Sequence, residues 1–298
     1  MMLSLSGLAK PQYLFRPSQI VRRLLRELRN NPRDESVLLP WGLALALDPA
    51  DTIDNALLSQ GIYDLVTTEV LWRLTAPGDR TADIGANVGY MTSVLSTRAG
   101  PTGSVLAFEP HPGTFAILQR NAERWNNNAS CARVFLQQGA ISDRDGTATL
   151  IVHHGADPNV SHAFLASDAA QSGIEVSIWT FARFLVEGAR FGVVKVDTET
   201  HEARVFAGMG SALNDGRIRD ILFEEEKAYP AASHKVVQSA GYTVFGCEER
   251  LSGPRLVPPE QVSGPKRPYD ILPNYLATRD AQRAKQLLAR PGWQCLRG

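Results

Sequence analysis

A short apolar run that leads directly into a glycine-bearing turn and then a helix is the feature that most constrains this chain. The run and turn read Thr81-Ala-Asp-Ile-Gly-Ala-Asn-Val-Gly-Tyr90, and a helical pattern continues to Thr97. Gly85 and Gly89 remove the Cβ where a backbone must approach a ligand closely, and Asn87 tolerates left-handed backbone geometry. A strand, tight turn and helix in this order are typical of a Rossmann-like sheet. We therefore predict an α/β fold with a ligand site at this turn.

Strand and helix patterns alternate along the rest of the chain. Helices are expected at Thr67–Leu74 and, most clearly, at Thr114–Trp125. β-like pieces at Thr147–His153 and Glu175–Trp179 are joined by a Ser/Ala/Asp-rich loop, which we expect to lie over a ligand. The alternation predicts a doubly wound, mostly parallel sheet covered by helices. The runs expected to form its strands are Thr81–Ile84, Ser104–Phe108, Ala132–Leu136, Val193–Val196 and Asp220–Phe223.

Composition and charge exclude several classes of protein. Of 298 residues, 44% are hydrophobic and 21% charged, which is too apolar for an intrinsically disordered chain. Basic and acidic residues number 31 each, so no net positive field attracts nucleic acid. Cys131, Cys247 and Cys295 are scattered and odd in number, which predicts neither a disulfide framework nor a zinc site. Because no apolar run approaches the roughly 20 residues of a membrane span, we predict a cytoplasmic protein.

Positive charge is concentrated near the N-terminus. Residues 1–33 hold seven basic side chains and the single acid Glu27, a net charge of +6, so the other 265 residues carry −6. Apolar residues recur at helical spacing from Ile20 to Leu28, opposite arginines, which predicts an amphipathic basic helix. This helix packs on the body of the protein or, alternatively, binds a partner, a membrane surface or a second copy of the chain as a homodimer.

The chain divides into three expected regions. Residues 1–75 form a helical extension and lead-in, residues 76–253 the ligand-binding domain, and residues 254–298 a C-terminal strap that packs on the body. The stretch 254–273 is rich in proline and glycine, which is typical of an extended segment, and 280–289 predicts a short helix.

Two acids indicate which ligand the glycine turn accepts. Asp83 precedes the first glycine, where a carboxylate repels phosphate and suits a positively charged ligand. Glu109 ends the second strand, 24 residues after Gly85, close to the interval at which a carboxylate meets the two hydroxyls of a nucleoside ribose. A cationic amino-acid end and a ribose together describe S-adenosylmethionine better than NAD.

Several motifs in this order resemble the FkbM-type methyltransferases, a family of Rossmann-like enzymes that depend on S-adenosylmethionine. The resembling residues are Asp83-Ile-Gly-Ala-Asn-Val-Gly89, Ala107-Phe-Glu-Pro-His-Pro112, Ala140-Ile-Ser-Asp143 and Lys195-Val-Asp-Thr-Glu199, with Glu202 and Gly208. The similarity covers roughly residues 40–250. It implies a seven-stranded sheet in the order 3-2-1-4-5-7-6 with one antiparallel strand.

The resemblance also implies a set of cofactor contacts. Ala140 and Ile141 offer backbone and apolar contact to the adenine ring, with Ser142 or Asp143 near its amino group. The residues expected to bind the cofactor are Asp83, Gly85, Asn87, Gly89, Glu109, Pro110, Ala140, Ile141 and Asp143.

Polar residues at the end of the fourth strand are the candidates for proton removal. Asp197, Glu199 and His201 follow that strand at the carboxyl edge, where open α/β sheets bind their ligands. A histidine has an ordinary pKa near 6.5 and is the natural base at neutral pH, whereas a carboxylate needs its pKa raised by burial. The alternative for His201 is a hydrogen-bonded bystander. In the family this segment reads roughly K-x-D-x-E-G-x-E, so Thr200 replaces a glycine and His201 a small residue, and the backbone bend is open to question.

Two other polar groups have competing interpretations. Glu224–Glu226 end the fifth strand as a solvated charge run, or one of them points into the site. His153, His154 and His162 lack acids at ligand spacing, and Asp197 with Glu199 lacks further partners for Mg²⁺. We expect no metal.

These features predict an O-methyltransferase that acts on a hydroxyl of a small molecule or a sugar, in specialised-metabolite or glycan tailoring, and releases S-adenosylhomocysteine. One rival is N-methylation of a small molecule or peptide. Another is a non-catalytic subunit that binds S-adenosylmethionine and assists a partner through the N-terminal helix. The loops that would form the acceptor pocket carry no motif, so they leave the acceptor undefined.

Overall fold

The computed structural model describes residues 36–47, 57, 61–152, 163–166, 172–186, 188–262 and 273–297. The basic helix predicted from Ile20 to Leu28 lies outside these residues, as do His153, His154 and His162. Within the described part of the chain, no helix is long and apolar enough to cross a membrane.

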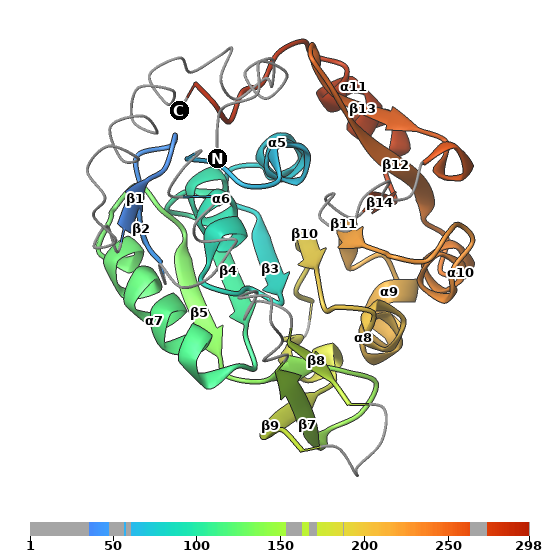
Figure 1. Ribbon diagram of the computed structural model, residues 1–298. Coiled ribbons are helices and arrows are strands. Elements are labelled where there is room, and N and C mark those ends of the chain that lie inside the picture. The colour runs from blue at the N-terminus through green and yellow to red at the C-terminus, as the bar shows by residue number, and fades with distance from the viewer. Residues whose placement is uncertain are drawn as a thin grey trace, which may run out of the picture.

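One twisted sheet organises the molecule. Its strands are β3 Arg80–Ile84, β4 Ser104–Phe108, β5 Arg133–Gln137, β10 Phe191–Val196, β11 Ile218–Glu224, β12 Thr243–Arg250, β13 Gly253–Val257 and β14 Asn274–Thr278. Their order is β13-β12-β14-β11-β10-β3-β4-β5 (Figure 1). Strands β5, β4, β3, β10 and β11 are parallel, and β14 is antiparallel to both of its neighbours. The Rossmann-like α/β class and the strand order 3-2-1-4-5-7-6 are therefore confirmed.

The number of strands and part of the C-terminal prediction need correction. The sheet has eight strands instead of seven, because the chain reverses at Leu251 and Ser252 and β13 pairs antiparallel with β12. β14 lies between β11 and β12 with all five residues buried, although we predicted a strap and helix packed on the body for this region. The apolar run of β14 is short and directly follows Pro273 and a proline- and glycine-rich stretch. The sequence there therefore indicates an extended segment and gives no sign of a strand.

Helices cover both faces of the sheet, which explains why its central strands are almost continuously apolar. Successive strand residues point to opposite faces, so Val193 and Leu222 belong to one core, and Val194 and Ile221 to the other. The first core includes residues of α5 Leu65–Leu74, α6 Tyr90–Ala99, α7 Pro112–Asn126 and α11 Ala281–Leu288. The second includes residues of α8 Glu202–Gly208, α9 Ser211–Asn214 and α10 Ala232–Ser239.

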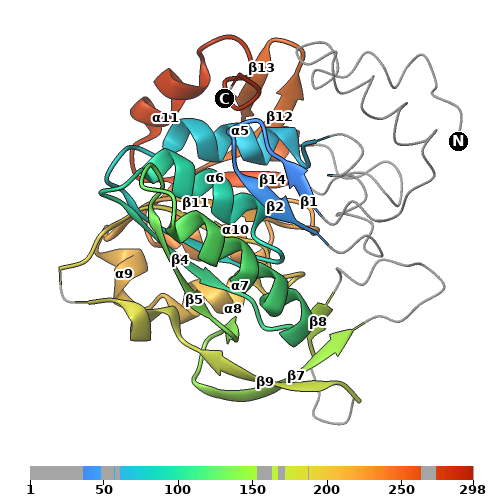
Figure 2. The ribbon, with the colours of Figure 1, turned by 90° about the vertical axis from the view of Figure 1, so that its left-hand side faces the viewer.

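Smaller elements complete the fold. A second sheet has the order β6-β9-β7-β8 and lies at the bottom of both views (Figures 1 and 2). Its strands are β6 Ala140–Ile141, β7 Gly146–Val152, β8 Ala163–Leu165 and β9 Ile174–Trp179, and the β-like pieces predicted here are confirmed in β7 and β9. The remaining elements are the hairpin of β1 Ser36–Leu38 and β2 Ala44–Ala46, and the 3₁₀ turns η1 Phe181–Phe184 and η2 Pro259–Gln261.

The C-terminal segment holds α5 in place. Glu69 and Arg73 form a fully buried ion pair on α5, with Arg73 Nε 2.6 Å from Glu69 Oε1. The carboxylate of Glu69 also accepts the backbone N–H groups of Gln294 and Cys295 at 2.7 and 2.8 Å. The N-terminal end of α5 lies at the carboxyl end of β11, because Asp64 accepts a hydrogen bond from Asn274, the register partner of Glu224. This anchor therefore fixes one wall of the candidate site.

Candidate active site

The turn after β3 and the segment after β10 meet at the carboxyl edge of the sheet. The N–H groups of Gly85 and Ala86 both donate to the carbonyl of Phe108, at 3.1 and 2.8 Å. Asp197 N–H donates to the carbonyl of Ile84 at 3.0 Å. A Cβ at position 85 would overlap the carbonyl oxygen of Asp197, so glycine is required there by the neighbouring backbone.

The turn itself has the left-handed geometry expected of it. Gly85, Asn87 and Gly89 have φ angles of 79°, 50° and 98°. Gly89 is the N-cap residue of α6, and a Cβ there would press on the side chains of Leu118 and Trp125 in α7. Gly89 therefore serves packing as well as the turn.

Glu109 closes the turn from the neighbouring strand. Its buried carboxylate accepts the Asn87 N–H at 2.9 Å and the His111 N–H at 2.8 Å, one on each oxygen. Burial raises the pKa of Glu109 to about 7, although the two backbone hydrogen bonds oppose this shift. Each oxygen keeps a second acceptor position, so two ligand hydroxyls can bind. Pro110, the next residue in the chain, is half-buried.

Asp83 and Lys195 form a buried charge pair beneath the turn. They are register partners on β3 and β10, with Lys195 Nζ 3.7 Å from Asp83 Oδ1. Thr92 donates to Asp83 Oδ2 at 2.6 Å, but Asp83 Oδ1 has no hydrogen-bond donor. Burial raises the pKa of Asp83, and Lys195 opposes that shift.

Lys195 connects this pair to the segment after β10. This segment, Asp197–His201, holds the candidates for proton removal, and we call its surroundings the reacting end. Its ammonium lies 3.0 Å from Asp197 Oδ2 and donates to the carbonyl of Gly85 at 3.2 Å. Burial lowers the pKa of Lys195, but the charges of Asp197 and Asp83 outweigh this and leave the pKa raised. The ammonium stays charged and ties the glycine turn to the segment after β10.

His201 lies on the side of the site predicted for adenine. Its Nε2 is 2.9 Å from the hydroxyl of Ser142, which directly follows β6. Burial, and then the charge of Arg204, lowers the pKa of His201 to about 4, while Asp143 opposes the shift. Ala140 and Ile141 are buried beside Ser142, and Asp143 is exposed.

The segment after β10 bends through two left-handed residues. Glu199 and Thr200 have φ angles of 50° and 75°, so the bend survives although threonine stands where the family has glycine. Glu202 then begins α8, and its carboxylate accepts the N–H and the hydroxyl of Thr198, both at 3.0 Å. Burial raises the pKa of Glu202 to about 7.

The three consecutive glutamates after β11 have different environments. Glu224 faces the reacting end, where burial and then the charges of Asp197 and Glu199 raise its pKa. Glu225 accepts hydrogen bonds from the hydroxyl of Ser233 and the backbone of Lys227, so it fixes the start of α10. Glu226 is exposed. The pleat of β11 explains why Glu224 and not Glu225 faces this side. Leu222 packs on the α5 side of the sheet, and Glu224, two residues later, lies on the same face.

Tyr63 and Asp64 complete the site, and sequence reasoning did not identify them. Asp64 caps α5 by accepting the Thr67 N–H at 3.0 Å, and it accepts Asn274 Nδ2 at 3.1 Å. Burial, and then the charges of Asp64 and Asp197, raises the pKa of the Tyr63 phenol. An aspartate three residues before Thr67 is a helix-cap signal, but nothing local indicates that it lies near Asp197. Lys195 belongs to the motif that resembles the family, but no role was predicted for it; its signal is a charge inside an apolar strand.

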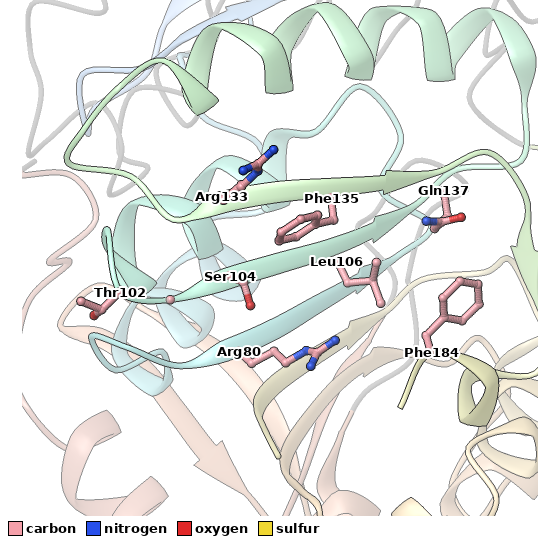
Figure 3. Close-up of a pocket in the computed structure, with 9 residues that line it drawn as sticks. Arg80, Thr102, Ser104, Leu106, Arg133, Phe135, Gln137 and Phe184 are labelled. Carbon is pink, nitrogen blue, oxygen red and sulfur yellow. The ribbon is translucent and has the colours of Figure 1, made fainter. Parts of the chain in front are cut away.

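A separate hollow of about 550 Å³ lies over β3, β4 and β5, on the face of the sheet where Leu106 joins the second core (Figure 3). Its lining residues are Arg80, Thr102, Gly103, Ser104, Leu106, Arg133, Phe135, Gln137 and Phe184. None of the residues predicted for cofactor binding or catalysis is among them. The described residues also hold no group of three His, Cys, Asp or Glu side chains arranged to bind a metal.

The residues at the sheet edge fit S-adenosylmethionine. Glu109 has free acceptor positions for the two ribose hydroxyls, and Asp83 has a buried oxygen without a donor beside the turn that would meet a cationic amino-acid end. The fold and this donor set define a Rossmann-like methyltransferase.

Comparison with known proteins identifies the family. The methyltransferase FkbM domain matches residues 83–243, more than half of the chain, and the chain belongs to this family of S-adenosylmethionine-dependent methyltransferases. It is 29% identical over 206 residues to the 31-O-demethyl-FK506 methyltransferase FkbM of Streptomyces tacrolimicus, covering 59% of this chain and 76% of that protein. It is 33% identical over 134 residues to the hexuronic acid methyltransferase AglP of Haloferax volcanii, covering 44% and 50%. A solved methyltransferase FkbM from Methylobacillus flagellatus aligns with a TM-score of 0.42 and 12% identity, over 78% of this chain and 56% of that one.

Proposed function

We propose that this enzyme transfers the methyl group of S-adenosylmethionine to a hydroxyl of a small molecule or sugar. The observation that carries the proposal is the position of Asp197 and Glu199 directly after β10, where the backbone of Asp197 packs against Gly85 of the glycine turn. The relatives support it, because one is named as an O-demethyl-FK506 methyltransferase and another as a hexuronic acid methyltransferase.

We assign the cofactor contacts to the residues that the sequence predicts for them. Glu109 orients the ribose, Asp83 attracts the amino-acid end, and the backbone of the turn excludes water from that end. Ala140 and Ile141 supply the flat apolar wall for adenine. The residues assigned to the cofactor are Asp83, Gly85, Asn87, Gly89, Glu109, Pro110, Ala140, Ile141 and Asp143. When bound, the cofactor supplies a methyl carbon activated by the sulfonium.

We assign proton removal to Asp197 or Glu199 in preference to His201. The imidazole of His201 is bonded to Ser142 on the adenine side, and its lowered pKa of about 4 makes it a weak base. Asp197 is oriented by the Lys195 ammonium at 3.0 Å, so its carboxylate is held in one position before an acceptor arrives. His201 then positions the wall that contains Ser142.

An acceptor screen that measures S-adenosylhomocysteine release tests the reaction. With an accepted alcohol, Asp197→Asn or Glu199→Gln should lower kcat by roughly 10²–10⁴, and His201→Ala by less than about tenfold. Cofactor affinity and melting temperature serve as controls for folding.

Two results would contradict these assignments. A large loss in His201→Ala with normal carboxylate variants would make His201 the base. Cofactor binding without product release for any acceptor would favour the non-catalytic alternative.

The acid-rich reacting end also suits an amine acceptor, so N-methylation is a second candidate. Burial raises the pKa of Glu224 and of Asp64, and their carboxyl oxygens can accept hydrogen bonds from the N–H groups of an amine. Matched alcohol and amine acceptors of the same skeleton separate the two reactions: methylation of the amine alone would overturn the hydroxyl assignment.

A further inference from the structure

The hollow over β3, β4 and β5 has no part in the reaction proposed above. Its volume of about 550 Å³ lies within the ordinary range of small-molecule sites. Leu106 on β4 is buried in the second core, whereas Phe135 on the edge strand β5 keeps 48% of its surface exposed. An exposed aromatic side chain that borders a hollow offers apolar contact area to a ligand.

Strand register arranges the lining residues in rows across the sheet. Arg80, Ser104 and Arg133 are the first residues of β3, β4 and β5 and are register partners, so they form one row. Leu106 and Phe135, two residues further along their strands, are register partners on the same face. Figure 3 shows the two arginines on the outer strands with β4 between them. The hollow therefore combines two cations with an apolar floor.

Neither arginine of this row is paired with an acid. The guanidinium of Arg80 lies 5.0 Å from the ring centre of Phe191, and that of Arg133 lies 5.4 Å from the ring centre of Phe135. Asp79 directly precedes Arg80, but its carboxylate pairs with Arg219 at 2.9 Å. Among the described residues, no carboxylate forms an ion pair with either guanidinium of the hollow.

Stacking on an aromatic ring orients a guanidinium without consuming its donors. The N–H groups lie in the plane of the guanidinium, so its edge stays available to an acceptor while its face covers the ring. Carboxylate and phosphate oxygens accept two such N–H groups side by side. Neighbouring strands lie about 4.8 Å apart, which places the backbones of Arg80 and Arg133 about 10 Å from each other. Ser104 lies between them, and its hydroxyl adds a donor.

We propose that this hollow binds a small amphipathic anion, with an aromatic or aliphatic body over Leu106 and Phe135 and a carboxylate or phosphate group between the two arginines. Charge complementarity selects the anionic group, and the apolar row selects the body. The ligand is distinct from the methyl acceptor, because none of the lining residues belongs to the reacting end or to the predicted cofactor contacts. The inference therefore stands apart from the proposed reaction.

Two other occupants suit this face less well. The basic segment 20–28 of this chain would bring further arginines to a surface that already carries two. An added strand from a partner would need the free edge of β5, but the side chain of Asn126 covers it at Val134. Asn126 accepts the Val134 N–H at 2.7 Å and donates to its carbonyl at 3.0 Å. Such covering of an edge strand opposes strand addition.

An NMR titration of the full, isotope-labelled chain with 2-naphthoate tests the site. This ligand joins two aromatic rings to one carboxylate, and we expect it to bind with a Kd of about 1 mM or tighter and to shift the amide signals of Leu106 and Phe135. 2-Naphthalenemethanol keeps the rings without the charge, and acetate keeps the charge without the rings. Each should bind at least about tenfold more weakly than 2-naphthoate.

Variants of the two arginines test the recognition of charge. Arg80→Gln and Arg133→Gln should each weaken 2-naphthoate binding by about fivefold to tenfold, and the double variant should lose the preference for the carboxylate over the alcohol. Arg120→Gln is the matched control, since it removes an exposed arginine from α7 on the other face of the sheet and should leave the Kd unchanged. Arg133 is exposed, so Arg133→Gln still tests the site if Arg80→Gln does not fold.

Several results would overturn the proposal. One is displacement of 2-naphthoate by excess S-adenosylhomocysteine, which would place the ligand in the cofactor site. Equal binding of the carboxylate and the alcohol, or normal binding by the double variant, would show that the arginines do not recognise an anion. A wild-type dimer that Arg133→Gln makes monomeric would assign the hollow to a second copy of the chain. Methyl transfer is measured separately, so failure of this site leaves the proposed reaction untouched.

Discussion

The two strand-to-helix turns at the carboxyl edge of the sheet both contain left-handed residues, but of very different types. The turn after β3 places Gly85, Asn87 and Gly89 at its left-handed positions, all of which tolerate such geometry. The turn after β10 places Glu199 and Thr200 there, and a β-branched residue at φ 75° is strained.

The difference shows what each turn is selected for. The first is shaped by close packing, of Gly85 on the backbone of Asp197 and of Gly89 on side chains of α7, so glycine stands where space is short. The second presents acids and keeps its strain, a pattern that recurs at functional sites. The residue types of the first turn are thus set by the space around the backbone, and those of the second by the acidic groups that it carries.

The largest effect is expected from a side chain added to the first turn. Gly85→Ala would drive its Cβ into the Asp197 carbonyl, so we expect cofactor affinity to fall by roughly 100-fold or more, or the fold to fail. Gly42→Ala, in the turn between β1 and β2, is the matched control. Gly42 has a similar φ of 84° with open space around a Cβ, and the change should cost about 1 kcal/mol of stability without changing affinity. Calorimetry and urea unfolding measure both, and equal behaviour of the two variants would contradict the close-approach argument.

An intermediate effect is expected from the acid that closes the first turn. Glu109→Gln replaces one accepting carboxylate oxygen with an amide N–H₂, which is a donor and cannot accept from a backbone N–H or a ligand hydroxyl. The variant should therefore bind S-adenosylmethionine about tenfold more weakly. In the wild type, affinity should rise as the pH increases through about 7, because the pKa of Glu109 is raised to about 7 and the carboxylate is the better acceptor. The variant should lose this pH dependence.

The same raised pKa affects the stability of the ligand-free protein. Between the ordinary pKa of 4.5 and about 7, folded Glu109 keeps a proton that the unfolded chain has released. Its contribution to the free energy of unfolding therefore decreases as the pH rises through this window. A wild-type protein that loses no more stability than Glu109→Gln between pH 4.5 and 7 would show that burial does not shift this carboxyl.

Local signals explain why the first turn could be predicted and most of the reacting end could not. Gly85 and Asn87 are recognised from the turn itself, and Glu109 from its interval in a strand-helix-strand unit. Tyr63 and Asp64 lie at the sheet edge because Asp64 accepts a hydrogen bond from Asn274 and α5 is anchored by the C-terminal segment, and no local pattern records either contact.

The alternation of side chains along a strand also indicates which charged residues face the site. Val193 and Lys195 share one face of β10, so a charge at position 195 had to point to the same side as Asp83. The same alternation along β11 places Glu224, the first of the three consecutive glutamates, on the face of Leu222. The position of β14, in contrast, depends on a strand that returns from near the C-terminus to lie between β11 and β12, and short apolar runs do not reveal such insertions.

The smallest effect is expected from relieving the strain in the second turn. Left-handed geometry costs a non-glycine residue roughly 1–2 kcal/mol, and the extra unfolded-state freedom of glycine offsets about half of any gain. Thr200→Gly should therefore raise the free energy of unfolding by about 0.5–1 kcal/mol, measured by urea unfolding. Thr200→Ala keeps a Cβ and should gain less. Equal stability of all three proteins would mean that the bend is unstrained. A stabilised Thr200→Gly with reduced kcat would instead show that the strain helps to hold Asp197 and Glu199 in position.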